Sequence, residues 1–246
     1  MSLPFLTQAI QNANLNLQPE AVLQIAEKLQ RYSALLVEWN QRFNLTAITD
    51  DEGIALRHFV DSLTVLAALS AAPLPNKPAR LIDVGTGPGF PGIPLKVARP
   101  DLSVTVMDSV AKKVKFCAEV IRQLGLTGIR AEQGRAEEVA HQPAYREQFD
   151  VVTARAVAAL PTLVEYLLPF AKVGGVCIAM KGSDAEAEAA QAENAIRTLG
   201  GRLNRVVPVT LPGLPDKRAL IVIDKIAPTP LVYPRQGGMP RSAPLM

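Results

Sequence analysis

A glycine-rich segment that follows a short apolar run is the part of this sequence whose residue types and spacing most clearly favour chemistry. Residues 81–84 read Leu-Ile-Asp-Val, which is typical of a buried strand, and residues 85–92 read Gly-Thr-Gly-Pro-Gly-Phe-Pro-Gly. Glycines at this density let the backbone turn sharply and approach a ligand without clashes of Cβ atoms. Because such loops bind nucleotides when they lie between a strand and a helix, the segment predicts a nucleotide-type site.

The other residues of the loop narrow the kind of ligand. Phe90 stands where the dinucleotide-binding pattern has its third glycine, no basic residue lies in the loop, and no Gly-Lys-Ser/Thr of a P-loop follows. We therefore expect Gly85, Gly87 and Gly89 to shape a pocket for a ligand without a phosphate. The alternative interpretation is that these glycines form only a tight turn.

Acidic residues follow the next two predicted strands. Asp108 ends the second strand, where a carboxylate accepts hydrogen bonds from both ribose hydroxyls and repels a 2′-phosphate. Ala136 and Glu137 follow the third strand, where they can meet the edge of an adenine. With the glycine loop, these positions describe a nucleoside that has a non-phosphate tail, which fits S-adenosylmethionine as the cofactor. In the alternative interpretation the acids are solvated helix caps.

The methyl acceptor is narrowed by exclusion. Enzymes that methylate an exocyclic amine usually carry a polar-Pro-Pro-aromatic loop after the fourth strand. Here residues 153–157 read Thr-Ala-Arg-Ala-Val, so the motif is absent and an exocyclic amine is not favoured as acceptor. Methylation of a pyrimidine carbon needs a nucleophilic cysteine, commonly in a Pro-Cys pair, but Cys117 and Cys177 follow Phe and Val and are expected to be reduced core thiols. The remaining acceptor carries its own lone pair, as a ring nitrogen does. Such a transfer needs no general base and depends mainly on positioning.

Two residues are candidates for positioning the reactants. Arg155 is expected at the end of the fourth strand, where it could bind the methionine carboxylate or a phosphate of the acceptor. The alternative is a buried arginine that pairs with Asp150 or Glu165. His58 lies on the flank of a predicted helix and is either a positioning residue or a surface or capping histidine.

Several cations are candidates for contact with RNA. Lys112 and Lys113 open the helix after Asp108, where positive charge opposes the helix dipole, so helix stability does not explain them but a phosphate backbone does. The alternative is a solvated basic face, to which Lys115 also belongs. Arg57 is spaced to pair with Asp61 one helical turn later. The other candidate cations are Lys181, Arg235 and Arg241.

Hydrophobic periodicity predicts an α/β fold. The predicted helices are 20–43, a second from about residue 52 with Asp50 or Asp51 as N-cap, 92–98, 112–124, 159–170 and 185–199, and the predicted strands are 81–84, 103–108, 129–133, 149–154, 176–180, 203–210 and 218–224. A turn at Gly174 and Gly175 is expected before the fifth strand. Strands that alternate with helices form a mostly parallel sheet, and the two closing strands without a helix between them should pair antiparallel.

Three parts of the chain are expected. They are an N-terminal helical extension (1–78) that ends in a Pro-rich linker (71–78), a Rossmann-like domain (79–227) and an extended basic tail (228–246). The chain starts without the pattern of a signal peptide and has no apolar run of membrane-spanning length, so we expect a cytoplasmic protein without a membrane partner. We also expect a monomer and no metal site.

The charge balance is mildly basic. The 246 residues contain 26 Lys and Arg and 23 Asp and Glu, which gives a net charge of +3. This charge permits a polyanionic partner but does not demand one, because nucleic-acid-binding domains are often more basic.

Taken together, these residues resemble the bacterial small-subunit rRNA guanine-N7 methyltransferase family, known as RsmG or GidB. The resemblance covers nearly the whole chain, from Trp39-Asn40 to Pro244-Leu245. The segments that carry it are Asn44-Leu45-Thr46-Ala47, Arg57-His58 with Asp61-Ser62-Leu63, residues 83–92, Asp108-Ser109 with Lys112-Lys113, Arg135-Ala136-Glu137, Arg155-Ala156, Met180-Lys181-Gly182, and Tyr233-Pro234-Arg235 with Gly238 and Pro240.

The resemblance implies a Rossmann-like class I methyltransferase with an N-terminal helical extension. It further implies transfer of a methyl group from S-adenosylmethionine to N7 of a guanine in the decoding-region loop of 16S rRNA, with the small ribosomal subunit as partner. The family's cofactor positions correspond to Gly85, Phe90, Ala136, Glu137 and Arg155.

One departure concerns the tail, which is often more basic in the family where this chain has Gln236 and Ser242. The departure weakens the interpretation of the tail as the main contact with RNA. Two alternatives stay open: a methyltransferase that acts on another substrate, and a non-catalytic RNA-binding or ribosome assembly factor that retains a cofactor pocket.

Overall fold

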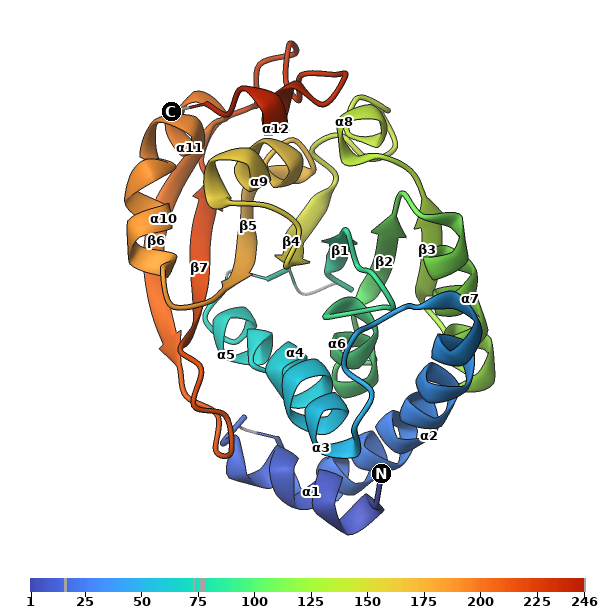
Figure 1. The fold of residues 1–246 in the computed structure, drawn as a ribbon. Helices are drawn as coiled ribbons and strands as arrows, with labels where there is room; N and C mark the ends of the chain where they lie inside the picture. Colours follow the sequence, from blue (N-terminus) through green and yellow to red (C-terminus); the bar gives the residue numbers. More distant parts are fainter. Residues whose placement is uncertain (16, 73, 76–77, 246) are drawn as a thin grey trace.

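A seven-stranded sheet forms the centre of the molecule in the computed structural model (Figure 1). The structure describes residues 1–15, 17–72, 74–75 and 78–245. The strand order is β3-β2-β1-β4-β5-β7-β6, and β7 runs antiparallel to both of its neighbours. The predicted mostly parallel sheet with a closing antiparallel hairpin is therefore confirmed.

The strands lie close to their predicted ranges. They are β1 (Arg80–Val84), β2 (Ser103–Asp108), β3 (Ile129–Gln133), β4 (Phe149–Arg155), β5 (Ala171–Lys181), β6 (Gly201–Val209) and β7 (Arg218–Lys225). The fifth strand begins earlier than expected, because a register shift between Phe149 and Val151 lets the segment that contains Gly174 and Gly175 continue the strand instead of ending in a separate turn.

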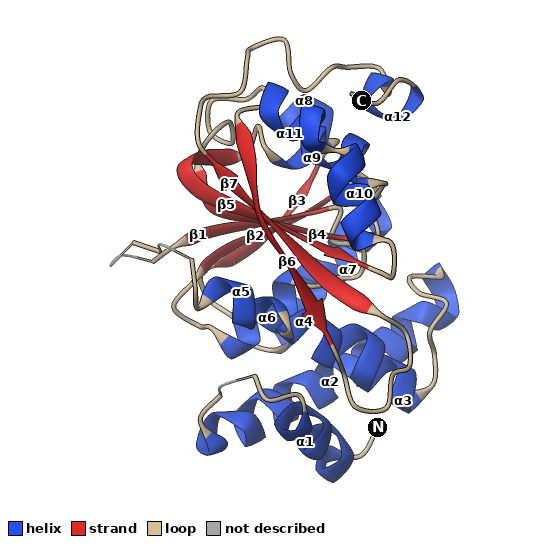
Figure 2. Cartoon of the chain, turned by 90° about the vertical axis from the view of Figure 1, so that its left-hand side faces the viewer, coloured by secondary structure: helices blue, strands red, loops and turns tan. Residues whose placement is uncertain are grey.

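Helices cover both faces of the twisted sheet (Figure 2). Those of the N-terminal part are α1 (Leu3–Asn12), α2 (Pro19–Phe43), α3 (Asp51–Gly53), the π-helical segment η1 (Ile54–Val60), α4 (Asp61–Leu63) and α5 (Val65–Leu69). The others are α6 (Gly92–Ala98), α7 (Ala111–Gln123), α8 (Ala136–Val139), α9 (Leu160–Leu167), α10 (Ala185–Gln191), α11 (Glu193–Thr198) and α12 (Met239–Ser242).

The N-terminal helices follow local signals of the sequence. Helix α2 begins at Pro19, which suits the first turn of a helix, and ends at Phe43, where Asn44 follows as the C-cap in the left-handed conformation that an Asn tolerates. Asp50 caps the next helix by accepting a hydrogen bond from Gly53 N at 2.7 Å. The π-helical segment η1 was not predicted, because hydrophobic periodicity does not distinguish it from an α-helix over so few turns.

Two further predictions are corrected by the structure. The helix expected over 185–199 is divided at Ala192 into α10 and α11. The tail is not simply extended, since it forms the short helix α12 and packs against α9 (Figure 1). Residue 246 of the tail lies outside the described residues.

Alternate residues of the strands face two hydrophobic layers. On β1, Leu81 belongs to the layer that the N-terminal helices, α6 and α7 cover, whereas Ile82 belongs to the layer beneath α9, α10 and α11. The first layer continues from α1 and α2 into the sheet without interruption, so the core packs across the expected boundary at residue 78. The division into parts stays a prediction, and positions 73, 76 and 77 of its linker lie outside the described residues.

None of the described helices combines the length and the apolar composition that crossing a bilayer requires.

Candidate active site

The glycine loop leaves β1 through conformations that exclude other residues at two positions. Gly85 has φ +70°, and a Cβ atom there would lie 2.6 Å from Val157 Cγ2. Gly89 has φ +101°, and a Cβ atom there would clash with the hydroxyl of Tyr32 and lie 2.6 Å from Ile93 Cδ1. The loop therefore needs glycine both for its backbone angles and for its close neighbours.

The buried carboxylate of Asp83 holds the glycine loop through hydrogen bonds. Asp83 Oδ2 accepts hydrogen bonds from Thr86 Oγ1 at 2.5 Å and from Gly92 N at 2.8 Å, and Oδ1 accepts from Thr153 Oγ1 at 3.3 Å. Asp83 is fully buried, and this burial raises the pKa of its carboxyl group to about 6 despite the donors around it. The carboxylate thus joins both ends of the glycine loop to β4.

Four of the predicted cofactor residues line one cavity of about 520 Å³. Gly85, Asp108, Ala136 and Glu137 come from the ends of β1, β2 and β3 and meet there. In open α/β sheets this edge, at the carboxyl ends of the strands, is where ligands bind. The volume lies within the usual range of small-molecule sites.

The carboxylate of Asp108 is held in place by backbone groups. Its Oδ2 accepts from Gly87 N at 2.9 Å and its Oδ1 accepts from Val110 N at 2.9 Å. Each oxygen keeps lone-pair capacity for a further donor, such as a ribose hydroxyl. Glu137 is also buried, with Arg135 Nη1 3.7 Å from its Oε1. Two fixed acceptors around a cavity without a phosphate-binding loop fit the nucleoside of S-adenosylmethionine.

The tail completes the wall of this cavity. Gly238 and Arg241 line it together with Tyr166 of α9. The tail is anchored by Arg235, whose Nη2 donates to Glu165 Oε2 at 2.7 Å and to the carbonyl of Ala243 at 2.8 Å. The guanidinium of Arg235 thus binds to groups of the protein itself. The predicted contact of Arg235 with RNA stays a prediction, and the ion pair with Glu165 makes it less favourable.

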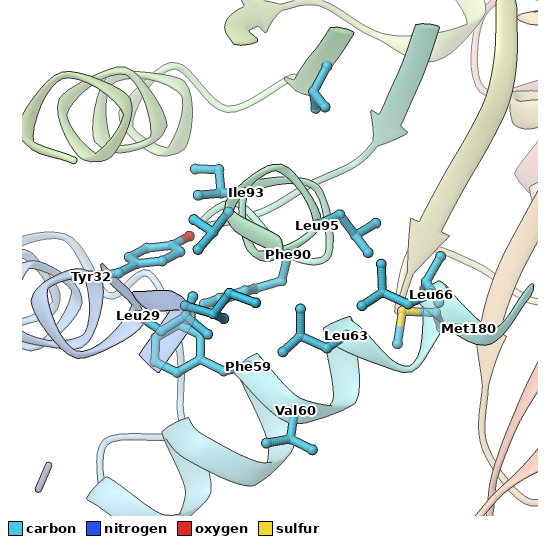
Figure 3. Packing of buried hydrophobic residues seen from close by; sticks show 14 of the residues in the cluster. Leu29, Tyr32, Phe59, Val60, Leu63, Leu66, Phe90, Ile93, Leu95 and Met180 are labelled. Carbon is cyan, nitrogen blue, oxygen red and sulfur yellow. The ribbon is translucent and has the colours of Figure 1, made fainter. Parts of the chain in front are cut away.

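The other predicted cofactor residues shape the site without lining this cavity. Gly87 and Gly89 are part of the loop, while Phe90 is buried in an aromatic cluster with Tyr32 and Phe59 (Figure 3). The hydroxyl of Tyr32 donates a hydrogen bond to the carbonyl of Pro88. Helix α2 of the N-terminal part therefore supports the glycine loop directly.

His58 packs against Phe90 and is largely buried. Its ring stacks on Phe90 with 4.6 Å between centroids, and Nε2 lies 2.8 Å from Thr46 Oγ1. Arg155 Nη2 lies 3.5 Å from Nδ1, and because a guanidinium only donates, Nδ1 is the acceptor and Nε2–H faces Thr46. Burial, aided by the charge of Arg155, lowers the pKa of His58 to about 4. His58 is thus neutral near pH 7 and serves as a packed support.

The lowered pKa of His58 predicts an acid-sensitive fold. The unfolded chain takes up a proton at His58 below about pH 6.5 but the folded protein only near pH 4, so this stabilisation is complete above pH 6.5 and is lost as the pH falls to 4. We expect the unfolding free energy of the wild type, relative to His58→Gln, to fall by about 3 kcal/mol over this range.

Urea unfolding of both proteins at several pH values measures this difference. The comparison with the variant is needed because the raised pKa of Asp83 acts with opposite sign in the same range and is common to both proteins. A difference that does not change with pH would show that His58 titrates alike in the folded and unfolded chains.

Arg155 does not have the partners expected for a purely structural arginine. Its Nη1 donates to Asp61 Oδ2 at 2.8 Å and to the carbonyl of Arg57 at 2.8 Å, instead of pairing with Asp150 or Glu165. Its guanidinium lies 5.1 Å from the centroid of the Phe90 ring. Arg155 therefore joins the end of β4 to η1 and α4, and it does not line the 520 Å³ cavity, although its neighbour Ala156 does.

The expected pair of Arg57 and Asp61 is corrected by the structure. Arg57 pairs with Asp216 in the loop before β7, and Asp61 pairs with Arg155 and Arg218. Partners from distant strands replace the neighbour one turn away, because they hold the buried carboxylate of Asp61 from both sides.

Lys181 braces the segment that follows β4. Its Nζ donates to the carbonyl of Ala158 at 2.6 Å and to Glu188 Oε2 at 2.7 Å, and the same carboxylate oxygen accepts from Leu160 N at 2.7 Å. These bonds favour a positioning role for Lys181 over direct contact with RNA, and both roles stay predictions.

The basic residues of α7 differ in their surroundings. Lys112 and Lys115 are exposed, whereas Lys113 is half-buried, lines the 520 Å³ cavity and has its Nζ 3.8 Å from Asp108 Oδ2. The two candidate RNA contacts of this helix thus differ, because Lys113 lines the 520 Å³ cavity and Lys112 does not.

The structure also shows residues of the site that the sequence analysis did not single out. Asp83, Tyr32, Arg218 and Asp216 all hold the loop or its surroundings. A signal existed only for Asp83, since a carboxylate inside an otherwise apolar strand is rarely buried without partners. Cys117 and Cys177 are free and buried, as expected, and burial raises the pKa of Cys177 to about 12.

Among the described residues, no group of three or more His, Cys, Asp or Glu side chains could hold a metal ion.

The order and direction of the strands define a class of protein by its fold, the Rossmann-like proteins with an antiparallel seventh strand. A structure of a point mutant of MtNAS in complex with S-adenosylmethionine superposes with a TM-score of 0.53 at 19% identity, and the match covers 92% of this chain and 85% of that chain. A structure of geranyl diphosphate methyltransferase with the same cofactor gives a TM-score of 0.51 at 14% identity, over 67% of this chain and 85% of its own. At these identities the similarity concerns the fold alone.

The family follows from sequence comparison. The family model GidB, rRNA small subunit methyltransferase G, matches residues 25–217. Ribosomal RNA small subunit methyltransferase G of Roseiflexus sp. (strain RS-1) is 52% identical over 89% of this chain and 91% of its own length. The protein of the same name from Leuconostoc citreum is 45% identical over 100% of both chains. The chain belongs to the rRNA small subunit methyltransferase G family.

Proposed function

We propose that this protein transfers a methyl group from S-adenosylmethionine to N7 of a guanine in the decoding-region loop of 16S rRNA. The observation that carries the proposal is the meeting of Gly85, Asp108 and Glu137 around one cavity, in a chain of the rRNA small subunit methyltransferase G family. Relatives that bear this name match most of the chain at 44–52% identity.

In this proposal, Asp108 holds the ribose and Ala136 with Glu137 meets the adenine. Gly85, Gly87 and Gly89 shape the space for the methionine, and Phe90 with Arg155 supports the loop from its other side. When bound, S-adenosylmethionine supplies an electrophilic methyl carbon on its sulfonium sulfur. The residues above would hold that carbon in line with the N7 lone pair, so that the methyl group could pass to N7 while the electron pair of the C–S bond stays with sulfur.

The side chains around the loop fit a transfer that removes no proton. N7 is itself the nucleophile and has no hydrogen to lose, so the reaction needs neither a general base nor a nucleophilic side chain. His58 is neutral and engaged with Thr46, and both cysteines are buried with raised pKa values. Catalysis then rests on alignment, which is what the contacts of Asp83, Tyr32 and Lys181 provide.

The direct test is a map of 16S rRNA methylation by mass spectrometry. A strain that lacks this gene should lose one N7-methylguanine, and the purified protein with S-adenosylmethionine should restore it on isolated small subunits. Unchanged methylation in that strain would reject the proposal. Binding of S-adenosylmethionine without transfer to any RNA would favour an assembly factor, and transfer to a different molecule would favour a methyltransferase of another substrate.

The exposed lysines of α7 give a second prediction. We expect Lys112→Glu with Lys115→Glu to weaken binding to small subunits and to reduce the slope of log affinity against log salt by about one for each lysine that contacts a phosphate. The affinity for S-adenosylmethionine should stay unchanged, because both side chains point to solvent. Filter binding across a salt series and calorimetry with the cofactor measure the two affinities.

A matched control reverses two exposed cations elsewhere. Lys28→Glu with Arg42→Glu on α2 changes the net charge by the same amount. If both double variants lose RNA affinity equally, the effect comes from net charge and the α7 surface is not a contact.

In the same proposal the enzyme acts in the cytoplasm as a monomer. Gel filtration of the purified protein would check the oligomeric state.

A further inference from the structure

A second pocket opens beside the cofactor cavity, across the segment that leaves β4. Its volume is about 300 Å³, and Ala156 lines both pockets. Ala156 has φ +55°, so the backbone turns in the left-handed region at the point where the two pockets meet. The other walls come from the ends of β4, β5 and β6, the start of β7, and α4. The pocket therefore lies at the same edge of the sheet as the cofactor cavity.

A chain of ion pairs runs along this pocket. It begins at Arg155, the neighbour of Ala156, whose Nη1 lies 2.8 Å from Asp61 Oδ2. Asp61 Oδ1 accepts from Arg218 Nε at 3.0 Å, and Arg218 Nη2 lies 3.6 Å from Asp216 Oδ2. Asp216 also pairs with Arg57. Three guanidinium groups against two carboxylates leave one positive charge in the chain.

The inner part of this chain is shielded from water. The side chains of Arg155 and Arg218 are each 15% exposed and that of Asp61 is 10% exposed. Burying charges is costly, and apolar side chains often replace a purely structural ion pair without loss of stability. A surplus positive charge in a partly dry pocket suits a ligand that brings a negative charge, such as a nucleotide with its phosphate.

The far end of the chain offers a carboxylate oxygen to a ligand. Asp216 is 49% exposed, and both of its ion pairs use Oδ2. Its Oδ1 accepts no hydrogen bond from residues 1–15, 17–72, 74–75 or 78–245. A carboxylate matches the N1–H and N2–H₂ donors on the Watson–Crick edge of guanine. Adenine presents an acceptor at N1 and no amino group at C2, so the same carboxylate disfavours it.

We propose, building on the proposed function, that this pocket receives the acceptor guanine flipped out of the RNA. N7 faces Ala156 and the cofactor cavity, and the Watson–Crick edge faces the carboxylate of Asp216, which Arg218 and Arg57 hold in place. Enzymes that modify a base take it out of the stack in this way, and proteins read single-stranded bases on their Watson–Crick edges. Asp216 is then a specificity residue, and Arg218 is a positioning residue.

The test combines a protein variant with a base analogue. Inosine lacks the N2 amino group of guanine but keeps N7, so small subunits reassembled with inosine at the target position are the probe. With the wild type at saturating S-adenosylmethionine, we expect kcat/KM to fall about 10-fold or more on inosine relative to guanine. For Asp216→Ala we expect kcat/KM on guanine to be about 10- to 100-fold lower than that of the wild type on guanine. The variant should have the same kcat/KM on inosine as on guanine.

The control is Asp224→Ala, which removes a carboxylate near the end of β7, the strand that follows Asp216, where it pairs with Arg202 at 3.0 Å. It should keep the full preference for guanine, and both variants should keep the wild-type affinity for S-adenosylmethionine. Equal penalties for inosine in the wild type and in Asp216→Ala would overturn the inference while leaving the proposed function intact. If the wild type transfers no methyl group to guanine-containing subunits, the proposed function fails and the inference fails with it.

Discussion

Asp108→Ala is expected to weaken the binding of S-adenosylmethionine about 100-fold or more. The carboxylate is the acceptor proposed for both ribose hydroxyls, and a hydrogen bond to a charged group contributes about 1.5–3 kcal/mol. The same change leaves the N–H groups of Gly87 and Val110 without their acceptor, so the glycine loop also loses its support. Isothermal titration calorimetry with the cofactor measures the affinity directly.

A matched control separates this effect from a general loss of charge. Asp101→Ala removes an exposed carboxylate that pairs with Arg99 just before the opposite end of β2. We expect this variant to bind S-adenosylmethionine as the wild type does. If Asp108→Ala and Asp101→Ala bound the cofactor equally well, the ribose would lie elsewhere and the assignment of the 520 Å³ cavity would be wrong.

Asp83→Ala is expected to lower the free energy of unfolding by about 3–5 kcal/mol. The change leaves Thr86, Gly92 and Thr153 without the acceptor that all three share inside the core. Urea unfolding near pH 7 measures the loss. Because the loop between Thr86 and Gly92 is released at both ends, the affinity for S-adenosylmethionine should fall as well.

The pH dependence of this loss gives an independent check. Burial raises the folded pKa of Asp83 to about 6, above the unfolded value of 3.8, so its contribution to stability is largest below pH 3.8 and falls as the pH rises through 6. The difference between the wild type and Asp83→Ala should therefore be larger at pH 4.5 than at pH 7.5. A difference that grows with pH would mean that the carboxyl group ionises easily in the folded protein.

Much of the fold could be predicted from the sequence because its signals are local. The apolar stripe of α2 repeats at helical spacing, and the ranges 92–98, 103–108 and 129–133 coincide with the predicted elements. The antiparallel pairing of β7 with β6 could be predicted because no helix lies between these two strands. Four of the residues predicted to bind the cofactor could be expected to lie together, because the ends of parallel strands meet at one edge of the sheet.

The rest depended on contacts between segments far apart in the chain. Asp61 meets Arg218 across 157 positions and Arg155 across 94, so its local pairing with Arg57 is lost. The tail reads as Pro- and Gly-rich and therefore as extended, but Glu165 holds it through Arg235. Lys113 and Lys112 are neighbours with the same charge, and only the orientation of α7 decides which of them faces the cavity.

The place of the tail has a consequence for how the enzyme is made. A ribosome releases β1, β2 and β3 long before it releases Gly238 and Arg241, which close the wall of the 520 Å³ cavity. A nascent chain therefore carries an incomplete cavity until residues 235–241 have been translated and Arg235 has paired with Glu165. A chain that stopped before Gly238 would contain all seven strands but would lack this part of the cavity wall, so we expect it to bind S-adenosylmethionine more weakly than the wild type.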